Sequence, residues 1–189
     1  DLVSSLKNYG NPISMDDIIN CKKNIQKIPE YSYAITFDDG FENNYKIAVP
    51  ILSENNTPAT FYITTDMIER NRMSWIDQIE YCFDKLEKLK IKLPWADNDY
   101  MLIDPASKIK CLNDIRYYVK NFMKIYEPTK IVNSIYEQCN EDVVYKSNHF
   151  LDKKMNWRQI KKLIKNPLFE VGGHGSDHIS LGSLDQIEL

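Results

Sequence analysis

Two short clusters of polar residues in this sequence carry side chains that can bind a metal ion and move a proton. Asp38 and Asp39 directly follow the apolar run at residues 33–37, and His174 and His178 stand four positions apart near the end of the chain. One aspartate of such a pair can hold a metal while the other accepts a proton. Taken alone, the two aspartates are equally well explained as a solvated turn, because Asp-Gly is a common turn pair.

The two histidines are set among glycines. Histidines at positions i and i+4 can face one metal ion from a helix or from a tight loop. Gly172, Gly173 and Gly175 argue against the middle of a helix and favour a strand that runs into a loop. Two surface histidines in a flexible loop are the alternative.

Three β-prone segments are expected to position both clusters. Residues 33–37, 59–64 and 168–172 are predicted strands, and a helical pattern over residues 43–54 joins the first two. A strand, a helix and a second strand in this space form a βαβ unit, so the sheet should be parallel and both clusters should lie at its carboxyl edge. Two imidazoles with Asp38 or Asp39 would then give the three protein ligands of a catalytic metal site, which leaves positions open.

The remaining segments are predicted to be mainly helical. Between the second and third strands, residues 66–153 are predicted to be a helical insertion, with helices over residues 75–89, over residues 106–126 and after Pro128, and a loop at residues 93–99. Outside the insertion, capping patterns predict helices over residues 15–28, over residues 157–164 and from Ser183 onward.

Composition excludes some functions and bears on the compartment. The chain has 189 residues, a net charge of −3 and no dense basic block, so nucleic acid is not an expected partner. No apolar run is long enough to cross a bilayer. The four cysteines form no Cys-x-x-Cys pair, which favours free thiols and a reducing cytoplasm. Association with the cell envelope stays open, because a chain that begins at Asp1 could have lost a leader, and no oligomeric state is predicted.

Four motifs in this sequence resemble those of the polysaccharide deacetylases of the NodB-homology type, carbohydrate esterase family 4. They are the Thr-Phe-Asp-Asp-Gly stretch at residues 36–40, the strand at 59–62, the Met-Asn-Trp helix start at 155–157 and the Gly-Gly-His-Gly-Ser-Asp-His-Ile-Ser-Leu stretch at 172–181. The resemblance covers residues 1–65 and 154–189, which would form one deacetylase domain interrupted by the insertion at residues 66–153.

The resemblance implies roles for four side chains. Asp38 would be the general base, and Asp39, His174 and His178 would bind a divalent metal, usually Zn²⁺, with Co²⁺, Ni²⁺ or Mn²⁺ as alternatives. The fold would be α/β, an incomplete distorted (β/α) barrel with a helical insertion. The expected partner is an N-acylated carbohydrate of bacterial metabolism, and the reaction is removal of its N-acetyl or related acyl group. The family often has Ser or Thr where this chain has Gly175, although glycine also occurs there in relatives.

Other motifs of the family have no counterpart in these 189 residues. They supply an arginine, its orienting aspartate, part of the acetyl pocket and the general-acid histidine, and three predicted strands cannot close a barrel. We therefore expect a fragment of a longer protein that lacks the general-acid motif, and His149, within the insertion, is not expected to replace that acid. Two alternatives follow: a non-catalytic carbohydrate-binding or scaffold protein that retains the metal site, and a deformylase or amidase acting on a different small amide.

Overall fold

The computed structural model of the protein describes residues 2–146, 149–179 and 182. Within them the chain divides into two compact units. The first contains the residues up to Arg72 together with those of 149–179, and the second contains Met73–Lys146. Both predicted clusters lie in the first unit. Among the described residues, none of the helices combines the length and the apolar character that a membrane span requires.

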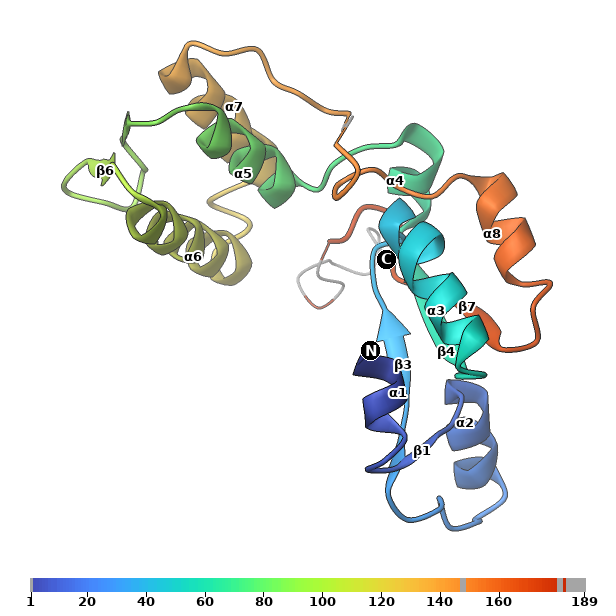
Figure 1. The fold of residues 1–189 in the computed structure, drawn as a ribbon. Helices are drawn as coiled ribbons and strands as arrows, with labels where there is room; N and C mark the ends of the chain where they lie inside the picture. Colours follow the sequence, from blue (N-terminus) through green and yellow to red (C-terminus); the bar gives the residue numbers. More distant parts are fainter. Residues whose placement is uncertain (1, 147–148, 180–181, 183–189) are drawn as a thin grey trace. The chain divides into compact units, whose positions relative to one another are not determined.

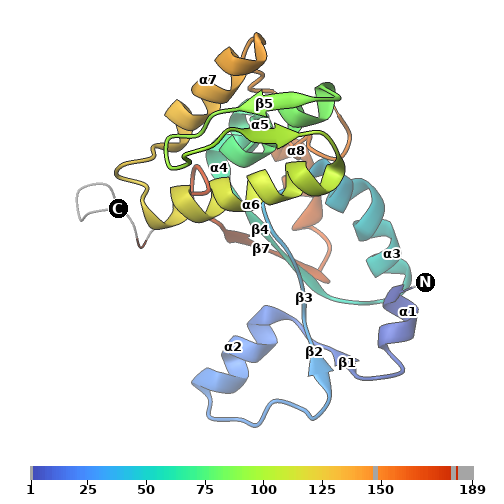
Figure 2. The same cartoon turned by 90° about the vertical axis from the view of Figure 1, so that its left-hand side faces the viewer.

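A parallel sheet of three strands organises the first unit. Its order is β3 (Ile35–Phe37), β4 (Ala59–Ile63) and β7 (Phe169–Gly173), with β4 in the centre. Phe37 pairs with Phe61, and Ile63 pairs with Gly173. The three strands lie side by side in Figure 2. The three strands and the parallel sheet predicted from the sequence are confirmed, and both ligand-bearing loops follow strands of this sheet.

Two helices cover the sheet in the first unit. α3 (Val49–Glu54) follows the π-helical turn η1 (Asn44–Ala48), and α8 (Trp157–Leu163) precedes β7 (Figure 1). Pro50 lies in the first turn of α3, and because it has no N–H, a wider turn directly before it is expected. α8 begins at the predicted Asn156 cap. The buried cluster of this unit comprises Leu52, Ala59, Phe61, Ile63, Ile68, Met155, Ile160, Leu163 and Phe169.

The N-terminal part of the first unit is less regular than predicted. It contains α1 (Leu2–Leu6), α2 (Met15–Lys23) and a short parallel pair, β1 (Asn11–Pro12) with β2 (Ser32–Tyr33). The capping box of Ser14 and Asp17 is present. The prediction that this helix reaches residue 28 is wrong: Ile25 has φ 54°, and the Gln26 N–H donates to the Cys21 carbonyl. This is the hydrogen bond of a Schellman end, so the helix ends before Ile25, which is exposed.

The second unit contains both helices and strands. Its helices are α5 (Trp75–Lys85), α6 (Pro105–Asn121) and α7 (Pro128–Cys139), and its antiparallel hairpin is β5 (Leu89–Ile91) with β6 (Tyr100–Leu102) (Figure 2). The predicted helix over residues 75–89 is therefore too long, because Leu86 is extended and Leu89 belongs to β5. The predicted loop at residues 93–99 lies between the hairpin strands. Each of these strands has only three residues, and an alternation of apolar and polar residues over so short a segment cannot be distinguished from helical spacing.

Barrel closure and the insertion remain predictions. The described residues form one three-stranded sheet and two pairs of strands. The helix predicted from Ser183 onward lies outside the described residues.

Candidate metal centre

The ends of two parallel strands bring the predicted ligands together. β3 ends at Phe37 and leads into Asp38 and Asp39, while β7 ends at Gly173 and leads into His174. The His174 N–H donates to the carbonyl of Ile63 at 2.8 Å, which continues the pairing of β7 with β4 by one residue. Because all three strands are parallel, these loops leave the same edge of the sheet.

Asp39, His174 and His178 form one cluster. Oδ1 of Asp39 lies 3.6 Å from Nε2 of His174 and 3.5 Å from Nε2 of His178. The three potential ligand atoms lie within 4.8 Å of one another, and the centroids of the two imidazole rings are 5.1 Å apart. One side of the cluster remains accessible, since the side chains of His174 and His178 are 36% and 40% exposed.

The backbone at this cluster adopts conformations that most residues avoid. Asp39 has φ 67° and His178 has φ 58°, both in the left-handed region. The buried Thr64 hydroxyl donates to the Asp39 carbonyl at 3.2 Å, and the Gly40 N–H donates to the Asp38 carbonyl. Non-glycine residues are uncommon in this region, and aspartate and histidine are among those found there more often.

The donor set suits a transition metal. Two imidazole nitrogens and a carboxylate oxygen are ligands for Zn²⁺ and its neighbours, and three protein ligands leave a coordination position open. Oδ1 of Asp39 is buried and has no hydrogen-bond partner among the described residues. A buried carboxylate oxygen normally has a partner. The side chains present therefore fit a divalent metal ion.

Asp38 and His149 lie outside this cluster. The Asp38 side chain is exposed and is not one of the three grouped side chains. Its assignment as general base stays a prediction. His149 is 55% exposed, and its Nδ1 lies 4.0 Å from Oδ2 of Asp152. It is not part of the cluster either.

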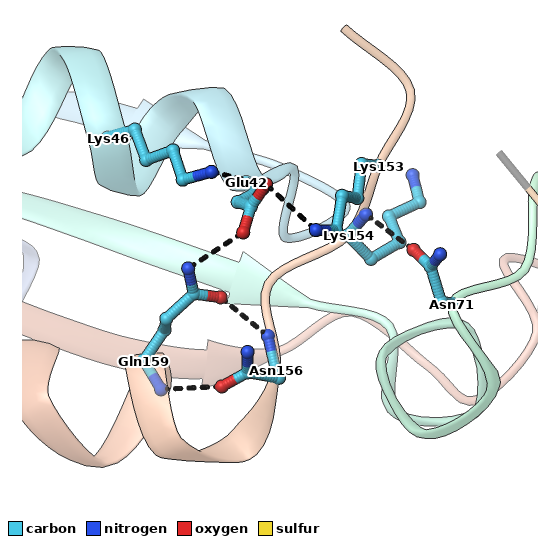
Figure 3. Close-up of polar contacts among 7 residues, drawn as sticks. All are labelled: Glu42, Lys46, Asn71, Lys153, Lys154, Asn156 and Gln159. Atoms are coloured by element: carbon cyan, nitrogen blue, oxygen red, sulfur yellow. Dashed lines mark hydrogen bonds and ion pairs between the residues drawn. The ribbon is translucent and has the colours of Figure 1, made fainter. Parts of the chain in front are cut away.

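Sequence reasoning missed a buried carboxylate beside the aspartate loop. Glu42 is 5% exposed and accepts hydrogen bonds from Lys46 at 3.0 Å and Gln159 at 2.9 Å, with Nζ of Lys153 at 3.5 Å (Figure 3). Burial alone would raise the pKa of Glu42, but the hydrogen bonds from Gln159 and Lys46 and the charge of Lys153 hold it below its ordinary value. The spacing of Glu42 and Lys46 at i and i+4 was the only signal in the sequence.

The Glu42 network joins the aspartate loop to the start of α8. The Glu42 N–H donates to the Lys153 carbonyl at 2.7 Å, and the Met155 N–H donates to the Gly40 carbonyl at 2.8 Å. These bonds tie Gly40 and Glu42 to the segment at Lys153 and Met155. The residues that immediately follow Asp39 are therefore held in place by the segment that precedes α8.

Part of the chain matches a known protein family. The model of a family described as polysaccharide deacetylase matches residues 26–96. The resemblance to polysaccharide deacetylases is thereby confirmed. The region that matches the polysaccharide deacetylase family contains Asp38 and Asp39, whereas His174 and His178 lie beyond it.

Two solved deacetylase structures are similar to the chain. One is the deacetylase domain of BpsB from Bordetella bronchiseptica, at 20% identity and a TM-score of 0.46. The other is a de-N-acetylase from Aggregatibacter actinomycetemcomitans, at 16% identity and a TM-score of 0.45. Each similarity covers 92% of this chain and 42% of the other, so the chain spans less than half the length of these structures. No curated protein matches the chain.

Proposed function

We propose that this protein is a metal-dependent hydrolase that removes an N-acetyl or related acyl group from an amino sugar of a polysaccharide or glycan. The observation that carries the proposal is the grouping of Asp39, His174 and His178 at one edge of a parallel sheet. It is supported by the match of residues 26–96 to the polysaccharide deacetylase family.

Each of the four side chains has a distinct role in the proposed reaction. Asp39, His174 and His178 hold a divalent metal, for which Zn²⁺ is the first candidate and Co²⁺, Ni²⁺ or Mn²⁺ are alternatives. When bound, such a metal supplies Lewis-acid activation of water and of an amide carbonyl. Asp38 accepts the proton that water loses as it attacks the amide. Its neighbour Asp39 is occupied as a ligand, which leaves Asp38 as the carboxylate available for proton transfer.

The accessibility of the site supports a bulky substrate. The two imidazoles are partly exposed, and so is Asp38, which is the neighbour of Asp39 in the sequence. An acyl group carried on a polysaccharide can reach such a site even though the protein does not enclose the polysaccharide. We therefore propose an N-acylated carbohydrate as the partner.

Acetate release from N-acetylglucosamine oligomers tests the function. The protein is loaded with Zn²⁺ or Co²⁺ and used in excess over the oligomer, so that a slow single turnover is detected. The wild type should release acetate, and Asp38→Asn should bind the metal normally but react at least about 100-fold more slowly, the lower range for loss of a general base. Asp16→Asn is the matched control, because Asp16 is an exposed aspartate of the same unit outside the cluster.

Two results would overturn parts of the proposal. A wild type that binds Zn²⁺ but releases no acetate would favour the carbohydrate-binding or scaffold alternative. Full activity of Asp38→Asn would remove Asp38 as the base while leaving the metal ligands unaffected.

A further inference from the structure

One segment contacts both loops that carry the candidate metal ligands. It comprises Thr64 to Arg72 and contains α4 (Thr65–Arg70). The Thr64 hydroxyl donates to the Asp39 carbonyl at 3.2 Å. The N–H groups of Thr65 and Asp66 donate to the carbonyls of Gly175 and Ser176 at 3.2 and 3.1 Å. These two N–H groups belong to the first turn of the helix, where they have no partner within the helix.

The same segment ends at Arg72, whose guanidinium forms an ion pair with the loop that carries the histidines. Nη2 of Arg72 lies 2.7 Å from Oδ1 of Asp177 and 3.2 Å from Oδ2 of Asp66. Asp66 is also paired with Arg70, whose Nε lies 2.8 Å from its Oδ1. The side chain of Asp66 is 18% exposed, that of Arg72 is 32% exposed and that of Asp177 is 40% exposed. A partly buried, networked ion pair of this kind orders its partners more than an isolated surface pair does.

The position of Asp177 gives this ion pair its importance. Asp177 directly precedes His178, whose φ of 58° is unfavourable for a residue with a side chain. The only glycine between the two histidines, Gly175, has φ 76° and lies on the other side of Ser176. The ion pair therefore fixes the chain next to a ligand whose left-handed backbone conformation needs support.

We propose that Arg72 is a positioning residue of the metal centre: its ion pair with Asp177 holds the loop so that His178 faces Asp39 before metal binds. This inference rests on the proposed function, because it presumes that the cluster binds a metal. Arg72 itself is not a ligand, and it acts through Asp177 and the backbone.

Simple electrostatics predicts the opposite effect of removing Arg72. A cation near the site repels a divalent metal, so Arg72→Met should tighten binding if charge alone mattered. If positioning dominates, the same substitution should weaken binding, because metal binding then includes the unfavourable free energy of ordering the loop. The sign of the change in metal affinity separates the two.

The experiment measures Zn²⁺ affinity of the whole chain by competition with a chromogenic chelator. Arg72→Met should bind Zn²⁺ at least about tenfold more weakly, the range expected when a supporting partner of a ligand is lost. Arg72→Lys, which keeps a cation, should recover much of the affinity. Arg70→Met is the matched control, since Arg70 pairs with Asp66 but not with Asp177, and it should leave the affinity unchanged.

The absorption spectrum of bound Co²⁺ provides a second readout, and it should change for Arg72→Met but not for Arg70→Met. Zn²⁺ affinity of Arg72→Met equal to or tighter than that of the wild type would overturn the inference. If Arg72→Met does not fold, as judged by circular dichroism, Arg72→Gln replaces it with the same expected weakening. A wild type that binds neither Zn²⁺ nor Co²⁺ would instead overturn the proposed function, so the two failures are distinguishable.

Discussion

Asp39 and His178 meet at the candidate metal centre with Oδ1 of one 3.5 Å from Nε2 of the other, and both have a left-handed backbone. Most residues with side chains adopt this conformation at a cost of about 1–2 kcal/mol each, whereas aspartate and histidine are better tolerated in it. Neighbouring contacts, such as the Thr64 hydroxyl on the Asp39 carbonyl, offset that cost. The surroundings therefore help to hold the pair in a facing arrangement.

Two substitutions of Asp39 distinguish the need for a left-handed backbone at this position from the need for a carboxylate that binds metal. Asparagine tolerates a left-handed φ, so the metal-free Asp39→Asn variant should be about as stable as the wild type. Asp39→Ala should lose about 1–2 kcal/mol. Both should lose more Zn²⁺ affinity than the roughly 10- to 100-fold that loss of a supporting partner costs. Chemical unfolding in a chelator and Zn²⁺ titration measure the two effects, and wild-type affinity in Asp39→Asn would exclude Asp39 as a ligand.

Bound metal should raise the unfolding free energy of the protein. A ligand that binds only the folded state at 100 times its dissociation constant adds about 2.7 kcal/mol. Thermal melting with Zn²⁺ should therefore show a higher Tm that EDTA reverses, and His174→Ala or His178→Ala should abolish the shift. His149→Ala is the matched control, because His149 lies outside the cluster. A Zn²⁺-dependent shift that survives loss of both His174 and His178 would place the metal elsewhere.

The parts of the site that the sequence predicts are those with strong local signals. The three strands are short apolar runs bounded by turn residues, and their parallel pairing follows from the helix that links β3 to β4. Ser14, Ser74 and Asn156 each begin a helix with the residue three positions later as their capping partner. Because parallel strands end at the same edge, the meeting of the aspartate pair with the two histidines could be predicted from the sequence, whereas the choice of Asp39 over Asp38 came only from the family resemblance.

The features that the sequence does not predict depend on contacts between distant residues. In the sequence Glu42 resembles a surface carboxylate, and only the folded protein places Gln159 and Lys153 next to it. The ion pair of Arg72 with Asp177 likewise joins positions that no local pattern relates. Ile25 ends α2 although isoleucine rarely adopts a positive φ, so the apolar spacing there gives the wrong helix length.

A side chain at Gly40 should destabilise the protein. It has φ 71°, and a Cβ there would lie 2.6 Å from Cδ1 of Ile68 and 3.3 Å from Cγ2 of Ile63. Gly40→Ala should lower the unfolding free energy by about 2–4 kcal/mol, from the backbone conformation and from crowding in the core. Gly175→Ala is the control, because Gly175 has φ 76° but no atom lies within 4 Å of the position that a Cβ would take, and it should lose only about 1–2 kcal/mol. Equal losses in urea unfolding would contradict crowding at Gly40.

Glu42 should make the stability of the first unit depend on acid pH. Its pKa is lowered in the folded protein, so its charged form stabilises the fold above its ordinary pKa of 4.5, and that stability is lost as the pH falls through the lowered folded value. Glu42→Gln should therefore reduce the unfolding free energy at pH 7 by about 1–3 kcal/mol, the range for a hydrogen bond to a charged group.

The difference between the wild type and Glu42→Gln should shrink as the pH falls from 4.5 through the lowered pKa of folded Glu42, because the carboxyl group then becomes neutral like the amide. Urea unfolding of both proteins from pH 7 to pH 3 measures this convergence. Glu54→Gln, which changes an exposed glutamate of the same unit, is the matched control and should show little difference at any pH. A constant difference between Glu42→Gln and the wild type across this range would mean that the loss arises from packing, and that the charge of Glu42 does not stabilise the loop that carries Asp39.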